Sequence, residues 1–163
     1  MSLRFIATRR QCRRRVNMER KHWALLVLDA ARPGSLSPLQ IQKILFLMNE
    51  RLSDEVGQDF YHFVPYNYGP FAPEIYADLR LLVDEGLARN IEYAGRSWVA
   101  YEISEKGTEL ASQIKASGPV SKRASEYIAK VVRWVESLTF TQLLSAIYKA
   151  YPQYATKSVF AST

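Results

Sequence analysis

The chain is poor in the residues that make disulfides, metal sites and catalytic centres. Cys12 is its single cysteine, which excludes an internal disulfide or a cysteine-based zinc site and predicts a reducing, cytoplasmic environment. Its two histidines, His22 and His62, have no second ligand at a useful spacing. A glycine-rich phosphate loop and a serine nucleophile elbow are also missing. We therefore expect a protein without enzymatic activity, metal or cofactor.

Long apolar runs are missing as well. A membrane-spanning helix needs about 18 to 20 mostly apolar residues, and no run in the chain approaches that length. The basic N-terminal segment is not followed by the apolar stretch and small-residue cleavage site of a secretory signal. The sequence predicts that the protein has no membrane partner.

Charge is concentrated at one end of the 163 residues. The formal net charge is +6, yet residues 1–21 alone hold eight arginines and lysines against a single glutamate. The remainder is close to neutral, so the basic isoelectric point describes an arm and not the domain. Three interpretations of residues 1–17 stay open: a phosphate-binding arm, a solvated tail, or an extension upstream of a native start at Met18. The phosphate-binding candidates in the arm are Arg9, Arg10, Arg13, Arg14 and Arg15.

Apolar periodicity predicts three helices in the first half of the chain. The first covers residues 18–31. The second begins at Ser37, which is followed by Pro38 and by Gln40 in a capping-box pattern, and its apolar residues occupy most of its circumference. The third begins near Pro73 and ends at Gly86.

The period then changes to that of strands. Alternating apolar residues at 91–93 and 99–103, with a turn between them, predict a β-hairpin. Ser104 caps a following helix, Gly118 and Pro119 interrupt the chain, and two amphipathic helices complete it. We predict a mainly α fold with a small β-hairpin (α+β): a winged-helix-like core at 18–118 and a C-terminal helical extension at 119–163.

Two sequence blocks resemble a known family. Residues 39–47, LQIQKILFL, resemble the LQKLLYF helix of the Panacea-type antitoxin family, which includes proteolysis-adaptor-like and phage-associated proteins. Residues 68–76, YGPFAPEIY, are similar to its block of Gly-Pro, hydrophobic, Pro, hydrophobic and Tyr positions. The resemblance covers residues 20–115 and implies a binding protein that neutralises a toxin or effector, or serves as an adaptor, in a phage-linked or defence locus. Lys43, Gly69, Pro70 and Pro73 match family positions, and we expect structural roles for them.

A nucleic-acid-binding regulator is the alternative function. The connection from Leu52 to Pro73 is much longer than the short turn of a helix-turn-helix, and the third helix is mostly acidic. The hairpin offers Arg89 and Arg96 for phosphate contacts, to which the basic arm would add. Because acidic side chains facing phosphates are unfavourable, we favour a partner protein.

The long connection is unusually rich in aromatic residues. We predict that residues 60–64 add a third strand to the hairpin sheet, and that Tyr66, Tyr68 and Tyr76 lie near one concave surface. Rigid tyrosines bury a large area at little entropic cost, so they suit a protein interface. The alternative is that these rings close a small core. The protein-binding candidates are Tyr66, Tyr68, Pro70, Phe71 and Tyr76.

The two C-terminal helices suggest a further interface. Amphipathic helices added to a winged core commonly form a homodimer or bind a partner. Trp134 lies off the apolar stripe of its helix and is expected to be exposed. The alternative is that both helices pack back onto the first and fourth helices.

Overall fold

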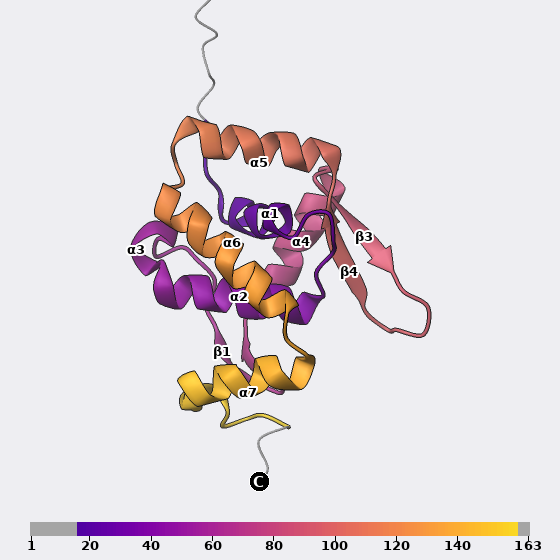
Figure 1. The fold of residues 1–163 in the computed structure, drawn as a ribbon, viewed down its shortest axis with the longest axis vertical. Coiled ribbons are helices and arrows are strands. Elements are labelled where there is room, and N and C mark those ends of the chain that lie inside the picture. Colours follow the sequence, from indigo (N-terminus) through magenta and orange to yellow (C-terminus); the bar gives the residue numbers. More distant parts are fainter. Residues whose placement is uncertain (1–15, 160–163) are drawn as a thin grey trace, which may run out of the picture.

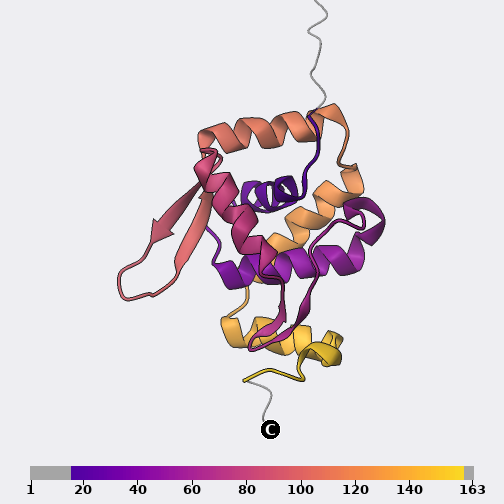
Figure 2. The ribbon, with the colours of Figure 1, turned by 180° about the vertical axis from the view of Figure 1, so that it is seen from behind.

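Helix α2 lies at the centre of the fold in the computed structural model, which describes residues 16–159. Helix α6 crosses it on one side, α1 and α5 stack above it, and α4 lies behind α1 (Figures 1 and 2). The elements in chain order are α1 (Arg20–Ala30), α2 (Pro38–Arg51), α3 (Ser53–Val56), β1 (Val64–Tyr66), β2 (Gly69–Phe71), α4 (Glu74–Asp84), β3 (Ala88–Glu92), β4 (Val99–Ile103), α5 (Glu105–Ser117), α6 (Lys122–Glu136), α7 (Phe140–Ala150) and the 3-10 turn η1 (Pro152–Tyr154).

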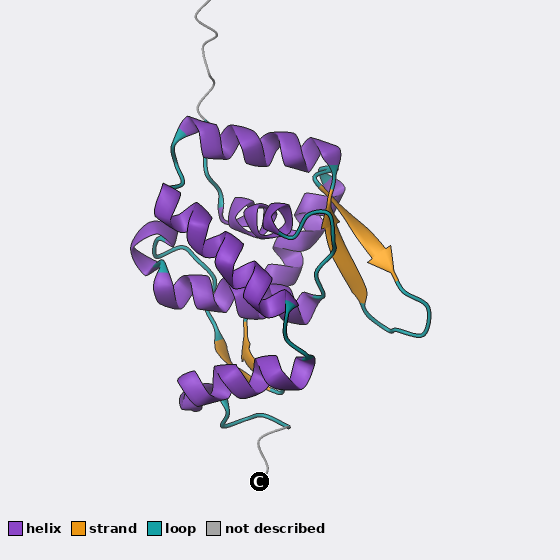
Figure 3. Ribbon diagram, in the orientation of Figure 1, coloured by secondary structure: helices purple, strands orange, loops and turns teal. Residues whose placement is uncertain are grey.

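The prediction of a mainly α fold with a small β-hairpin is confirmed (Figure 3). The predicted capping box of α2 is present, since the Gln40 backbone N–H donates to Ser37 Oγ and the Ser37 N–H donates to Gln40 Oε1. Residues 41–48 of this helix are all buried, including Gln42 and Lys43. A helix that is buried all round must satisfy its polar side chains internally, which becomes important at the site.

One apolar core runs through both predicted parts of the chain. It includes Trp23 of α1, Phe46 of α2, Ile114 of α5 and Val132 of α6. Helix α6 packs against both α1 and α2, whereas α7 lies lower, beside η1 and β2 (Figure 1). The residues that follow the break at Gly118 therefore bury apolar surface against the same core as the residues before it.

The expected hairpin is formed by β3 and β4, which pair antiparallel from Ala88 opposite Ile103 to Glu92 opposite Val99. The expected third strand at residues 60–64 is wrong. Phe60 and Tyr61 are buried in the core, and β1 pairs instead with β2 in a separate small hairpin. The outer edge of β4 is met by Leu36, which exchanges two backbone hydrogen bonds with Tyr101.

The described residues include no helix with the length and apolar character needed to cross a membrane.

Gly107 allows α5 to lie close to the backbone that leads into β3 and to the end of β4. A Cβ atom placed there would lie 2.0 Å from the carbonyl oxygen of Leu87 and 2.8 Å from Cγ1 of Ile103. We predict that Gly107→Ala lowers the free energy of unfolding by about 3 kcal/mol, because backbone must move to admit the methyl group. Urea denaturation measures this. The control is Gly34→Ala, whose Cβ would come no closer than 3.4 Å to another atom; equal losses in the two variants would contradict the prediction.

Candidate binding groove

The aromatic connection between α3 and α4 is fixed by two polar side chains of α2. The side chain of Gln42 donates to the Ala72 carbonyl at 2.8 Å, and its Oε1 accepts the Ala72 backbone N–H at 3.0 Å. This amide thus pairs with both backbone groups of a fully buried residue, and the Ala72 carbonyl also accepts the Ile75 N–H at 3.2 Å.

Lys43 makes the second of these contacts. Its Nζ donates to the Pro70 carbonyl at 2.8 Å, and only 2% of the residue is exposed. Burial lowers the pKa of Lys43 to about 7, because the charged ammonium loses its hydration. The structural role expected of this residue is therefore seen directly: it joins the first sequence block to the second.

The start of the connection is held by a buried acid of α4. Tyr61 Oη donates to Asp78 Oδ2 at 2.6 Å, and the Arg20 guanidinium donates to both carboxylate oxygens of Asp78. Arg20 also lies over the Tyr61 ring at 4.8 Å from its centroid. Burial, together with the hydrogen bond to Asp78, raises the pKa of Tyr61, so its hydroxyl remains a donor.

Gly69 allows the turn between β1 and β2. Its φ of +87° is a left-handed conformation that side chains with a Cβ rarely adopt. A Cβ here would also lie 3.2 Å from the Tyr148 ring of α7. The Gly-Pro step therefore does two things: it turns the chain and lets α7 approach β2 closely.

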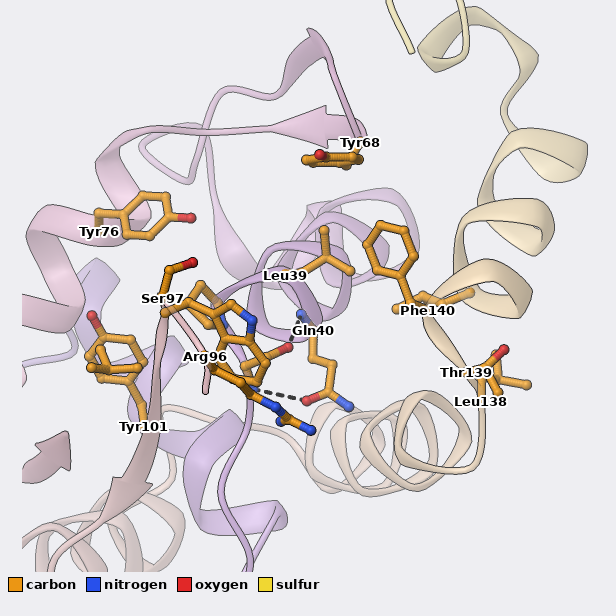
Figure 4. Close-up of a pocket in the computed structure, with 15 residues that line it drawn as sticks. Leu39, Gln40, Tyr68, Tyr76, Arg96, Ser97, Tyr101, Leu138, Thr139 and Phe140 are labelled. Atoms are coloured by element: carbon orange, nitrogen blue, oxygen red, sulfur yellow. Dashed lines mark hydrogen bonds between the residues drawn. The ribbon is translucent and has the colours of Figure 1, made fainter. Parts of the chain in front are cut away.

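A groove of about 780 Å³ opens beside this connection. Figure 4 shows it between the turn that carries Tyr68, the start of α2, the β3–β4 hairpin and the start of α7. Four of its lining side chains are large, aromatic and substantially exposed: Tyr68 at 43%, Tyr76 at 41%, Trp98 at 39% and Phe140 at 40%. Tyr68 and Phe140 meet edge to face across it, with ring centroids 5.6 Å apart.

The groove unites some of the predicted binding residues and excludes others. Tyr68 and Tyr76 line it, so two of the three tyrosines expected at one concave surface are found there. Tyr66 is not among the lining residues, and its ring stacks on that of Phe71 with centroids 4.9 Å apart. Pro70 is buried, and its carbonyl accepts a hydrogen bond from Lys43.

In the described residues, the two hairpin arginines proposed for nucleic acid have different surroundings. Arg89 is paired with Glu102 at 3.0 Å. Arg96 lines the groove, and its guanidinium lies over the Trp98 ring at 4.8 Å from the centroid and near the Tyr93 ring. The arm residues Arg9, Arg10, Arg13, Arg14 and Arg15 lie outside the described residues.

Sequence reasoning missed two walls of the groove. Trp98 lies in the hairpin turn, where the apolar periodicity of the sequence does not indicate which way a side chain faces. Phe140 begins α7 and carries no mark that separates it from the apolar stripe of that helix. Trp134 is exposed as expected, but it does not line the groove.

Comparison with protein-family models finds no matching family, and comparison with curated proteins finds no match. The family resemblance therefore rests on the two sequence blocks alone.

Buried Lys43 should make stability depend on pH. The unfolded lysine has a pKa near 10.4, so between about pH 7 and pH 10 the unfolded state binds a proton that the folded state has released. The free energy of unfolding of the native chain should therefore rise with pH across this window, by several kcal/mol relative to Lys43→Met. Paired urea titrations of the two proteins at each pH measure it. Lys106→Met is the control, because Lys106 also donates to a backbone carbonyl but is exposed; a Lys43→Met difference that is constant with pH would refute the assignment.

Gln42 should matter through the backbone groups that it satisfies. Gln42→Leu leaves the buried N–H of Ala72 without a partner, at about 1–3 kcal/mol, whereas the Ala72 carbonyl still accepts the Ile75 backbone N–H at 3.2 Å. We predict a loss of about 1–3 kcal/mol in the free energy of unfolding. Gln113→Leu, on the exposed face of α5, should change stability by less than about 0.5 kcal/mol. Chemical denaturation compares them, and similar effects in both variants would count against the clamp.

Proposed function

We propose that this chain is a non-enzymatic, winged-helix-like binding module of the Panacea-like type. Its role is to recognise a partner protein, as an antitoxin or an adaptor. The support from structure is the direct contact between the two resembling blocks. Gln42 and Lys43 of the first block hold Ala72 and Pro70 of the second. These residues need no catalytic role, because each has a structural one.

The observation that carries the proposal is the gathering of exposed aromatic side chains around one groove. Exposed aromatic residues on a rigid frame are typical of interface hot spots, since they bury a large area and lose little conformational freedom. Here the frame is rigid because the connection is held by Gln42, Lys43 and Asp78 from buried positions. A groove of this size, with aromatic and aliphatic walls and polar groups among them, is the default binding-site hypothesis for a folded domain.

A nucleic-acid regulator is less well supported by the same surface. Phosphate binding requires several lysines or arginines acting together. Among the residues that line the groove, Arg96 is the only charged side chain. The neighbouring Arg89 already has Glu102 as its partner.

The proposal is tested with matched pairs of exposed aromatic residues. Tyr76 and Trp98 line the groove, whereas Tyr66 at 49% and Trp134 at 41% exposed lie elsewhere. Three proteins are each expressed with an affinity tag in cells of the source organism. They are the full chain, the groove variant (Tyr76→Ser with Trp98→Ser) and the control variant (Tyr66→Ser with Trp134→Ser). Proteins recovered with each are quantified by mass spectrometry, and the purified partner is then titrated calorimetrically.

We expect one partner to be recovered with the native chain and the control variant but not with the groove variant. Loss of two aromatic anchors should weaken the purified complex by at least about 100-fold. Circular dichroism confirms that each variant is folded. Equal affinity of the two double variants for the partner would reject the groove as its binding site.

A further inference from the structure

We propose that the groove takes an extended segment of the partner protein, which adds to the free edge of β4 beside Val99 and places a carboxylate at Arg96. This inference rests on the proposed function and specifies the chemistry of the partner. It follows from three features of the groove: an unfilled strand edge, a single positive charge and aromatic walls.

The strand edge follows from the register of the sheet. Tyr101 exchanges two backbone hydrogen bonds with Leu36, so the N–H and C=O of Tyr101 face away from β3. In an antiparallel ladder the direction of these groups alternates from one residue to the next. Val99, two residues earlier and opposite Glu92, therefore directs its own N–H and C=O to the same outer edge.

Leu36 covers only part of that edge. After the bridge to Tyr101 the chain leaves the sheet, because Ser37 caps α2 and Pro38 begins it. Val99 lies beyond the bridge and lines the groove. An exposed edge with unpaired backbone groups is a template for an added strand, the mode known as β-augmentation.

The charge of the groove selects the side chain that lies next to this edge. Arg96 is the only charged residue among those lining the groove, and no ion pair of Arg96 is found within residues 16–159. Its guanidinium is already oriented by the Trp98 and Tyr93 rings. An arginine held in this way loses little freedom on forming a charge-assisted hydrogen bond, so a carboxylate is its natural partner.

The walls of the groove select the remaining side chains. Tyr76 stands on the side of α4, and Leu39 and Leu143 lie on the side of α2 and α7. Successive side chains of an extended segment point in opposite directions. A segment that pairs with Val99 thus presents alternate residues to these apolar walls, and we expect bulky apolar residues two positions apart, with an acidic residue near them.

The test uses a displayed library of random dodecapeptides as the probe and the full chain as the target. Selected peptides should combine alternating bulky apolar residues with an aspartate or glutamate. The best peptide is synthesised and its affinity for the native chain and for Arg96→Glu is measured by fluorescence anisotropy. We expect at least about a tenfold loss in Arg96→Glu, as for one charge-assisted hydrogen bond. Replacing the acidic residue of the peptide by lysine should restore binding to Arg96→Glu.

Arg133→Glu is the matched control, since Arg133 is exposed on α6 and outside the groove. A second measurement tests the strand pairing: methylation of single backbone nitrogens of the peptide should weaken binding at alternate positions only. The Val99 amide should become protected from hydrogen exchange in the complex.

The outcomes separate the two proposals. In one outcome, selected peptides bind the Tyr76→Ser, Trp98→Ser variant more weakly than the native chain and yet contain no acidic residue, or show no alternation on methylation. Either result would overturn this inference and leave the groove as the binding site. A library that yields no peptide would overturn this inference alone. Peptides that bind all groove variants equally would overturn both. Random single-stranded DNA serves as a parallel probe, and DNA binding abolished in Arg96→Glu would assign Arg96 to nucleic acid and overturn the inference.

Discussion

The structure depends on one constraint, which is that backbone groups of the aromatic connection left unpaired by its own β1–β2 hairpin must find partners in the core. Two side chains of α2 supply these partners. Gln42 donates to the Ala72 carbonyl and accepts the Ala72 N–H, and Lys43 donates to the Pro70 carbonyl. Buried polar groups with incomplete partners are costly, so these few bonds decide where the connection lies. The positions of Tyr68 on its turn and Tyr76 on α4 follow from them.

The sequence predicted most of the helical frame because the signals are local. Ser37 and Ser104 each cap the helix that follows, as their spacing indicates, and Gly86 and Gly118 have positive φ where a helix ends. Capping and left-handed turns involve residues close in sequence, which is why pattern analysis finds them.

What could not be predicted depends on contacts between residues far apart in the chain. The β-capable run at residues 60–64 does not join the hairpin sheet, because Tyr61 is drawn into the core by Asp78 and Arg20. Lys43 was expected to be structural from the family resemblance, but nothing in the sequence shows that it is buried. The groove likewise needed the relative positions of Trp98 and Phe140, which only the folded chain defines.

Side chains of α2 hold the aromatic connection in place as firmly as the core holds its helices. Native-state hydrogen exchange at the Ala72 amide tests it most directly, since the acceptor of this N–H is the Gln42 side chain. We expect the Ala72 amide to exchange as slowly as the backbone amides of α2. Exchange of the Ala72 amide as fast as that of the exposed residues 57–59 would contradict it.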